Sequence, residues 1–91
     1  VDVANKTNLI GRSGSLTLTK DSLLVVNLLT NISGDVTVDG KSVFSDSTPT
    51  SGIYATNIEI PLRAGQVINC TISTSGTNAK SYVVWVAPYF D

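Results

Sequence analysis

The sequence is 91 residues long and has a net charge of −1, with 14% charged and 42% hydrophobic residues. This length makes a single domain spanning residues 1–91, and near-neutral charge without a basic stripe excludes a nucleic-acid partner. One cysteine and no histidine exclude an intrachain disulfide and a Cys/His zinc site, and no apolar run approaches the roughly 18 residues of a membrane span.

Strand patterns dominate from the first third of the chain onwards. Residues 16–19 alternate apolar and polar side chains, which predicts a half-buried strand. Residues 23–30 form a nearly continuous apolar run, typical of a strand buried on both faces. Residues 35–38 alternate again, and Asp39-Gly40 separates them from residues 41–44. Asp-Gly between two such runs predicts a tight β-hairpin, because both turn positions take positive φ angles.

The second half of the chain continues the same pattern. Residues 45–52 form a polar loop with a proline, and strands are predicted at 53–60, 66–74 and 82–86, with Pro88 ending the last one. No ten-residue segment has a helical period. Short strands with turn signals every 8–12 residues predict an all-β fold. We expect an antiparallel β-sandwich, jelly-roll-like, of about seven strands.

The stretch EIPLRAGQVINCTI, residues 59–72, contains the only Glu and the only Cys. Pro61 has no N–H for a central ladder and predicts an edge or a strand end, while Gly65 supplies a positive-φ turn position. Cys70 alternates with Ile68 and Ile72, which predicts that it points into the core. The stretch is therefore interpreted as strand, turn and strand rather than as an active site.

Two segments together resemble a known family. The connection Ile60-Pro61-Leu62-Arg63-Ala64-Gly65-Gln66-Val67-Ile68 precedes the late aromatic strand Tyr82-Val83-Val84-Trp85-Val86-Ala87-Pro88-Tyr89-Phe90. This order is similar to the C-terminal head domains of phage tail fibres and related trimeric viral β-sandwiches, over roughly the last 40 residues. The resemblance implies a homotrimeric tip on a virion fibre, otherwise extracellular, that attaches to a host-surface saccharide or protein. It transfers no catalytic residue.

Catalytic and metal-binding patterns are weak. General acid–base hydrolysis uses paired carboxylates, but Glu59 stands alone, and Asp35 and Asp39 on one strand face would lie about 13 Å apart. A hydroxyl nucleophile would have only lysine as a base. The carboxylates lack the spacing of a calcium loop. We therefore expect no enzyme activity, no metal and no cofactor.

Receptor contacts are expected in loops, where aromatic and short polar side chains are exposed. Tyr54 follows the polar loop that contains Asp46, Asn78 lies in a turn, and Tyr89 follows Pro88. These four residues, Asp46, Tyr54, Asn78 and Tyr89, are the predicted receptor-binding residues, because aromatic rings serve as platforms for sugars.

The low charge also predicts a partner. A small domain has much surface, and a charged fraction of 14% is well below the roughly 25% of average soluble domains. We expect a homo-oligomer that covers the surplus apolar surface, and the resemblance implies a trimer. Because the chain begins at Val1, we also expect a fragment or C-terminal domain of a longer protein. The alternatives are a structural virion, tail or pilus module that binds no receptor, and a small carbohydrate-binding module of a bacterial protein.

Overall fold

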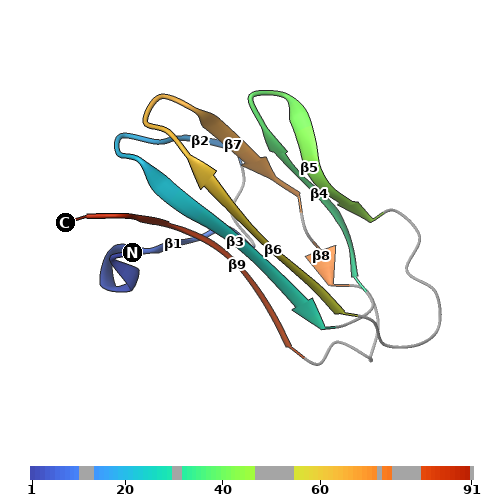
Figure 1. Ribbon diagram of the computed structural model, residues 1–91. Coiled ribbons are helices and arrows are strands. Elements are labelled where there is room, and N and C mark those ends of the chain that lie inside the picture. The colour runs from blue at the N-terminus through green and yellow to red at the C-terminus, as the bar shows by residue number, and fades with distance from the viewer. Residues whose placement is uncertain (11–13, 30–31, 47–54, 72, 75–80, 91) are drawn as a thin grey trace.

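The computed structural model consists of two antiparallel β-sheets that face each other (Figure 1). It describes residues 1–10, 14–29, 32–46, 55–71, 73–74 and 81–90. A short 3-10 helix, η1 (Val3–Asn5), precedes the strands. The strands in chain order are β1 (Thr7–Asn8), β2 (Ser15–Thr17), β3 (Ser22–Leu29), β4 (Ile32–Val38), β5 (Lys41–Asp46), β6 (Ala55–Leu62), β7 (Val67–Cys70), β8 (Ser73–Thr74) and β9 (Ser81–Pro88).

The strand order defines the topology. One sheet has the order β1-β9-β3-β6 and the other the order β2-β7-β4-β5, with β8 paired to the first residues of β4. The pairs β4/β5, β3/β6, β2/β7 and β1/β9 are nested within one another along the chain. The protein is thus a long antiparallel ribbon folded over into two sheets, which is the jelly-roll arrangement. The predicted all-β sandwich is confirmed.

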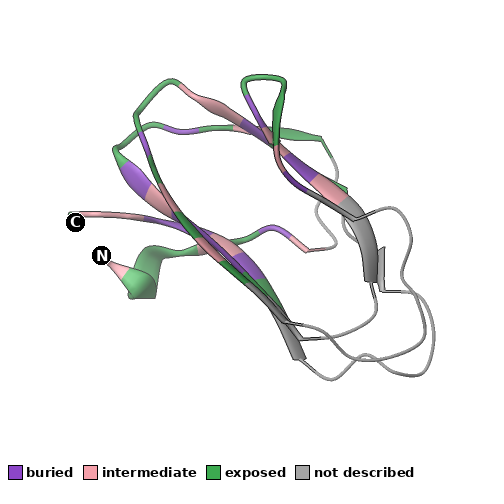
Figure 2. Cartoon of the chain, turned by 45° about the vertical axis from the view of Figure 1, so that its right-hand side comes forward, coloured by how far each residue is buried: buried purple, intermediate pink, exposed green. Residues whose placement is uncertain are grey.

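The core lies between the two sheets and follows the strand alternation. Leu24 and Val26 of β3 and Val36 of β4 have no exposed surface, and Ile68 of β7 is 1% exposed. Figure 2 shows these buried segments on strands of both sheets. The complete buried cluster is Leu9, Leu18, Leu24, Val26, Val36, Val38, Phe44, Leu62, Ile68, Cys70, Val84 and Val86. The predicted inward orientation of Cys70 is confirmed.

The Asp39-Gly40 turn joins β4 to β5 and is anchored to a neighbouring turn. Asp39 has a φ of 51° and Gly40 a φ of 81°, as a two-residue hairpin turn requires. The Asp39 carboxylate accepts hydrogen bonds from the backbone N–H of Val67 at 3.0 Å and from Nε2 of Gln66 at 3.1 Å. The Asp39 N–H donates to the Val67 carbonyl at 2.9 Å. The two hydrogen bonds to the carboxylate, that from the Val67 N–H first and that from Gln66 second, hold the pKa of Asp39 below its ordinary value of 3.8.

The turn between β6 and β7 lies in the stretch of residues 59–72 that the sequence predicted to be strand, turn and strand. Gly65 has a φ of 94°, and its N–H donates to the carbonyl of Leu18 at 2.7 Å. The Ala64 N–H donates to the carboxylate of Asp21 at 3.0 Å. Pro61 lies in β6, which is an edge strand of its sheet. The predicted strand, turn and strand are confirmed, and the turns after β2, β4 and β6 meet at one end of the sandwich, here called the turn end (Figure 1).

The strand count differs from the predicted number. The described residues contain nine strands rather than about seven, and the added ones, β1 and β8, are two residues each. Two residues are too few to produce an alternating pattern, so pairing with β9 and β4 alone makes them strands. The sequence also predicted one strand at 66–74, where the structure has the two strands β7 and β8, because the two residues of β8 carry no pattern that separates them from β7.

Removal of the Leu24 side chain beyond Cβ should destabilise the fold strongly. Leu24 is fully buried between the sheets, and Leu→Ala at such a site lowers the free energy of unfolding by about 2–5 kcal/mol. Asn69→Ala, on the exposed side of β7, should change it by less than about 0.5 kcal/mol. Urea denaturation measures both, and equal effects would contradict the placement of the core.

Stability should depend on the charge of Asp39. A carboxylate with a lowered pKa in the folded state stabilises the protein fully above its unfolded pKa, and this contribution is lost as the pH falls through the folded pKa. Asp39→Asn keeps a side-chain oxygen that accepts hydrogen bonds, and asparagine also tolerates positive φ, but the substitution removes the charge. We expect the variant to melt at a lower temperature at pH 7 and the difference to shrink as the pH falls below about 4. A difference that does not change with pH would show that the charge is not its origin.

Candidate functional site

The four predicted receptor-binding residues do not all fall within the described part of the chain. Tyr54 and Asn78 lie outside the described residues. Asp46 is the last residue of β5, where its backbone pairs with Gly34, at the end of the sandwich away from the turn end. Tyr89 is half-buried at the turn end, where its N–H donates to the carbonyl of Asp21 at 3.0 Å. Asp46 and Tyr89 therefore do not share a site within one chain.

A pocket opens along the edge of the sandwich formed by β1 and β2. These strands have two and three residues, so they cover the gap between the sheets only in part. The pocket has a volume of about 220 Å³ and is here called the edge pocket. Its lining consists of Asn5, Thr7, Leu16, Thr17, Leu18, Thr19, Lys20, Ser22, Val86 and Pro88.

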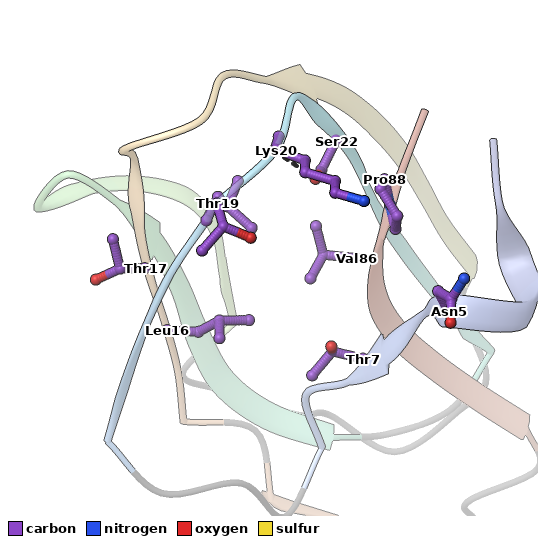
Figure 3. Close-up of a pocket in the computed structure, with 10 residues that line it drawn as sticks. Asn5, Thr7, Leu16, Thr17, Thr19, Lys20, Ser22, Val86 and Pro88 are labelled. Atoms are coloured by element: carbon purple, nitrogen blue, oxygen red, sulfur yellow. Dashed lines mark hydrogen bonds between the residues drawn. The ribbon is translucent and has the colours of Figure 1, made fainter. Parts of the chain in front are cut away.

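The edge pocket combines an aliphatic floor with polar walls. Val86 and Leu18 are buried members of the core cluster, so the floor is the side of the core itself. Ser22 is 4% exposed and donates its hydroxyl proton to the Lys20 carbonyl at 2.8 Å. In Figure 3 the hydroxyl groups of Thr7 and Thr19 are turned toward the pocket. The pocket thus offers hydrogen-bonding groups around an apolar base, the usual composition of a small-ligand site.

The outer side of the β1-β9-β3-β6 sheet is unusually apolar. Its side chains alternate with those that enter the core, and they include Val25 and Ala87, which are 9% and 1% exposed yet stand outside the core cluster. Lys6 lies over the half-buried ring of Trp85, with its Nζ 5.9 Å from the ring centroid. We call the apolar part of this surface the apolar face; its residues are Leu23, Val25, Pro61, Val83, Trp85 and Ala87, and the exposed polar residues Asn27, Asn57 and Glu59 lie beside it on the same side of the sheet.

The outer side of the other sheet has the opposite character. Thr17 and Asn69 are exposed there, and Thr37 pairs with Asn69. The residues of this polar face are Ser15, Thr17, Asp35, Thr37, Val67 and Asn69. The two outer surfaces of the sandwich therefore have different chemistry, although both sheets contribute equally to the core.

The exposed large hydrophobic side chains gather near β9. Among the described residues these are Val1 (50% exposed), Val3 (46%), Val83 (43%) and Phe90 (83%). Val83 belongs to β9, and Phe90 follows it. The Asp2 N–H donates to the Pro88 carbonyl at 2.7 Å, which brings the segment with Val1 and Val3 to the same strand. Exposed apolar side chains near β9 therefore come from the strand itself, from the N-terminal residues Val1 and Val3 and from Phe90.

Comparisons with models of protein families, with curated proteins and with solved structures found no match to this chain. The class that the structure itself defines is a two-sheet, all-β sandwich with jelly-roll topology. Within the described ranges, no three His, Cys, Asp or Glu side chains are grouped so that they could hold a metal ion. No described helix is long and apolar enough to span a bilayer.

The sequence did not predict the edge pocket. It predicted surplus apolar surface but did not place that surface on the outer side of one sheet. The pocket depends on β1, whose two residues carry no periodic signal, so its lining is assembled by pairing alone. The apolar face had a signal in the continuous apolar runs at 23–29 and 82–86. The run at 23–30 was interpreted as a strand buried on both faces, and Leu24, Val25 and Val26 are all buried; the run at 82–86 was predicted only as a strand.

Proposed function

We propose that this chain is a non-enzymatic, self-associating attachment domain of the kind that forms trimeric fibre heads on viruses and phages. Three copies would present their free surfaces together to a saccharide or protein on a host cell. Weak individual contacts then add up to firm attachment, because multivalent binding raises the effective affinity without a tight single site.

The observation that carries this proposal is the apolar face. Val83 is 43% exposed, Leu23 and Trp85 on the same outer side are half-buried, and Val25 between them is 9% exposed. Contiguous exposed apolar surface on a small soluble domain marks an interaction site. Only 14% of the chain is charged, which leaves few groups to keep such a surface in solution as a monomer.

A second copy of the chain suits this face better than an unrelated partner. One row across the sheet runs Asn8, Trp85, Val25 and Glu59, and Lys6 lies over Trp85 at the end of the row away from Glu59. The face therefore has a cation at one side and an anion at the other, with apolar residues between them. Such a surface is complementary to itself, since the Lys6 side of one copy can meet the Glu59 side of the next.

The strand edges disfavour association by strand addition. Pro61 removes an N–H from the edge strand β6, and Glu59 adds a charge to it. The edge strand β5 has a register shift opposite Val36 and Thr37, and β1 is two residues long. Proline, charge, bulges and short length are the devices that keep sheet edges from pairing. Contact through the apolar face avoids these edges.

A charge introduced on the apolar face should separate the copies. We expect the wild-type chain to have a solution mass near three times 9.6 kDa and Val83→Lys to have a mass near 9.6 kDa, because a lysine within the contact would be buried without a partner. Light scattering after size exclusion measures both masses.

The matched control is Asn69→Lys, which adds the same charge at an exposed strand position on the polar face and should leave the mass unchanged. A monomeric wild type would contradict the proposal and favour the carbohydrate-binding module instead. An oligomer that binds neither cells nor glycans would favour the structural virion, tail or pilus module.

The nominated tyrosines give a separate test of attachment. If Tyr54 and Tyr89 contact the receptor, Tyr54→Ala and Tyr89→Ala should weaken binding of the oligomer to cells or to a glycan array, by more than about 1 kcal/mol for an aromatic residue that anchors a contact. Phe90→Ala is the control for Tyr89, since Phe90 is the adjacent aromatic residue and is 83% exposed. Unchanged binding in both tyrosine variants would rule out these contacts.

A further inference from the structure

We propose that the edge pocket binds one acidic sugar residue, a six-membered ring that bears a carboxylate. The proposal rests on the attachment function proposed above only for the source of the sugar, a host-surface glycan. The site itself is formed by residues of η1, β1, β2, the β2–β3 connection, β3 and β9, and none of the four predicted receptor-binding residues lines it.

The volume of the pocket sets the size of the ligand. A cavity of about 150 Å³ accommodates a benzene ring, and a water molecule takes up about 30 Å³ of liquid. The edge pocket, at about 220 Å³, therefore has room for one substituted six-membered ring but not for two. Because it opens at the edge of the sandwich, the rest of a longer glycan would extend into solvent.

The lining matches the two kinds of surface that a sugar ring presents. Leu16, Leu18 and Val86 provide aliphatic carbon for the C–H groups of the ring. Thr7 and Thr19 have hydroxyl groups directed at the pocket (Figure 3), and each hydroxyl both donates and accepts hydrogen bonds. A purely apolar ligand would leave these groups without partners, whereas a hydroxylated ring satisfies them.

Ser22 gives the pocket a fixed acceptor. It is the one buried polar side chain in the described part of the chain, at 4% exposure. Its proton is committed to the Lys20 carbonyl at 2.8 Å, so its oxygen faces the pocket as an acceptor for a hydroxyl of the ligand. The same hydrogen bond ties the β2–β3 connection to the start of β3 and so positions the Lys20 backbone.

Lys20 selects for negative charge. It is the single charged residue of the lining, and Figure 3 shows its side chain reaching across the pocket mouth toward Pro88. An ammonium group donates up to three hydrogen bonds and accepts none, so a carboxylate is the complementary group. A neutral sugar would fill the same ring position without this interaction.

The test uses the ¹⁵N-labelled chain and two probes, glucuronate and the matched neutral sugar glucose, titrated through the millimolar range. We expect glucuronate to shift the amide resonances of residues 16–22 and 86–88 and to bind more tightly than glucose. Lys20→Gln should weaken glucuronate binding about two- to fivefold and leave glucose unchanged, as the loss of one exposed charge pair predicts. Lys41→Gln, a lysine at the β4–β5 hairpin outside the pocket, is the control and should change neither.

Thr7→Val tests the hydroxyl contact while it keeps the branched shape of the side chain. It should weaken both sugars, about two- to tenfold for one hydrogen bond. Absence of shifts, shifts confined to residues away from the pocket, or equal glucuronate affinity in wild type and Lys20→Gln would overturn the proposal. The solution mass is read independently, so a trimer without pocket shifts refutes only this inference, and a monomer with pocket shifts refutes only the proposed self-association.

Discussion

The fold depends on one turn, Asp39-Gly40, at which the chain reverses and begins to pair with its own earlier strands. Each later pair lies outside the one before it, from β4/β5 to β3/β6, β2/β7 and β1/β9. A slip of one residue at this turn would move every side chain of β5 to the opposite face, since side chains alternate along a strand. The positive φ values of Asp39 and Gly40 select the hairpin turn that prevents such a slip.

The hydrogen bonds of Asp39 also fix the position of the neighbouring β6–β7 turn. Its carboxylate and its N–H both form hydrogen bonds with the backbone of Val67, the first residue of β7, so the β4–β5 hairpin and the β6–β7 turn are held together. Asp21 does the same from the β2–β3 connection through the Ala64 N–H. Asp39, one of the carboxylates weighed in the sequence for acid–base chemistry, and Asp21 therefore both accept hydrogen bonds from backbone groups of turns.

A two-layer sandwich of this size explains why function is expected at its outer surface and its open edge. The inner sides of both sheets are used by the core, and the turn end is occupied by hydrogen bonds between turns. Among the described residues, the surfaces that remain are the apolar face, the polar face and the edge pocket. The proposed self-association uses the first and the proposed sugar site uses the last, so the two interactions do not compete for the same residues.

The sequence by itself determined the fold class, the Asp39-Gly40 hairpin, the turn at Gly65 and the burial of Cys70, and it restricted Pro61 to an edge or a strand end. These features are local: they follow from alternation, from positive φ angles and from a missing N–H, each of which acts within a few residues. The predicted contacts Asp46 and Tyr89 rested on loop position alone, which says nothing about distance between loops. Only the tertiary structure decided that they lie at opposite ends, that β1 pairs with β9, and that Thr7, Lys20 and Val86 line one pocket. The physical reason is that nested pairing joins residues far apart in the chain, and no local pattern records which strands become neighbours.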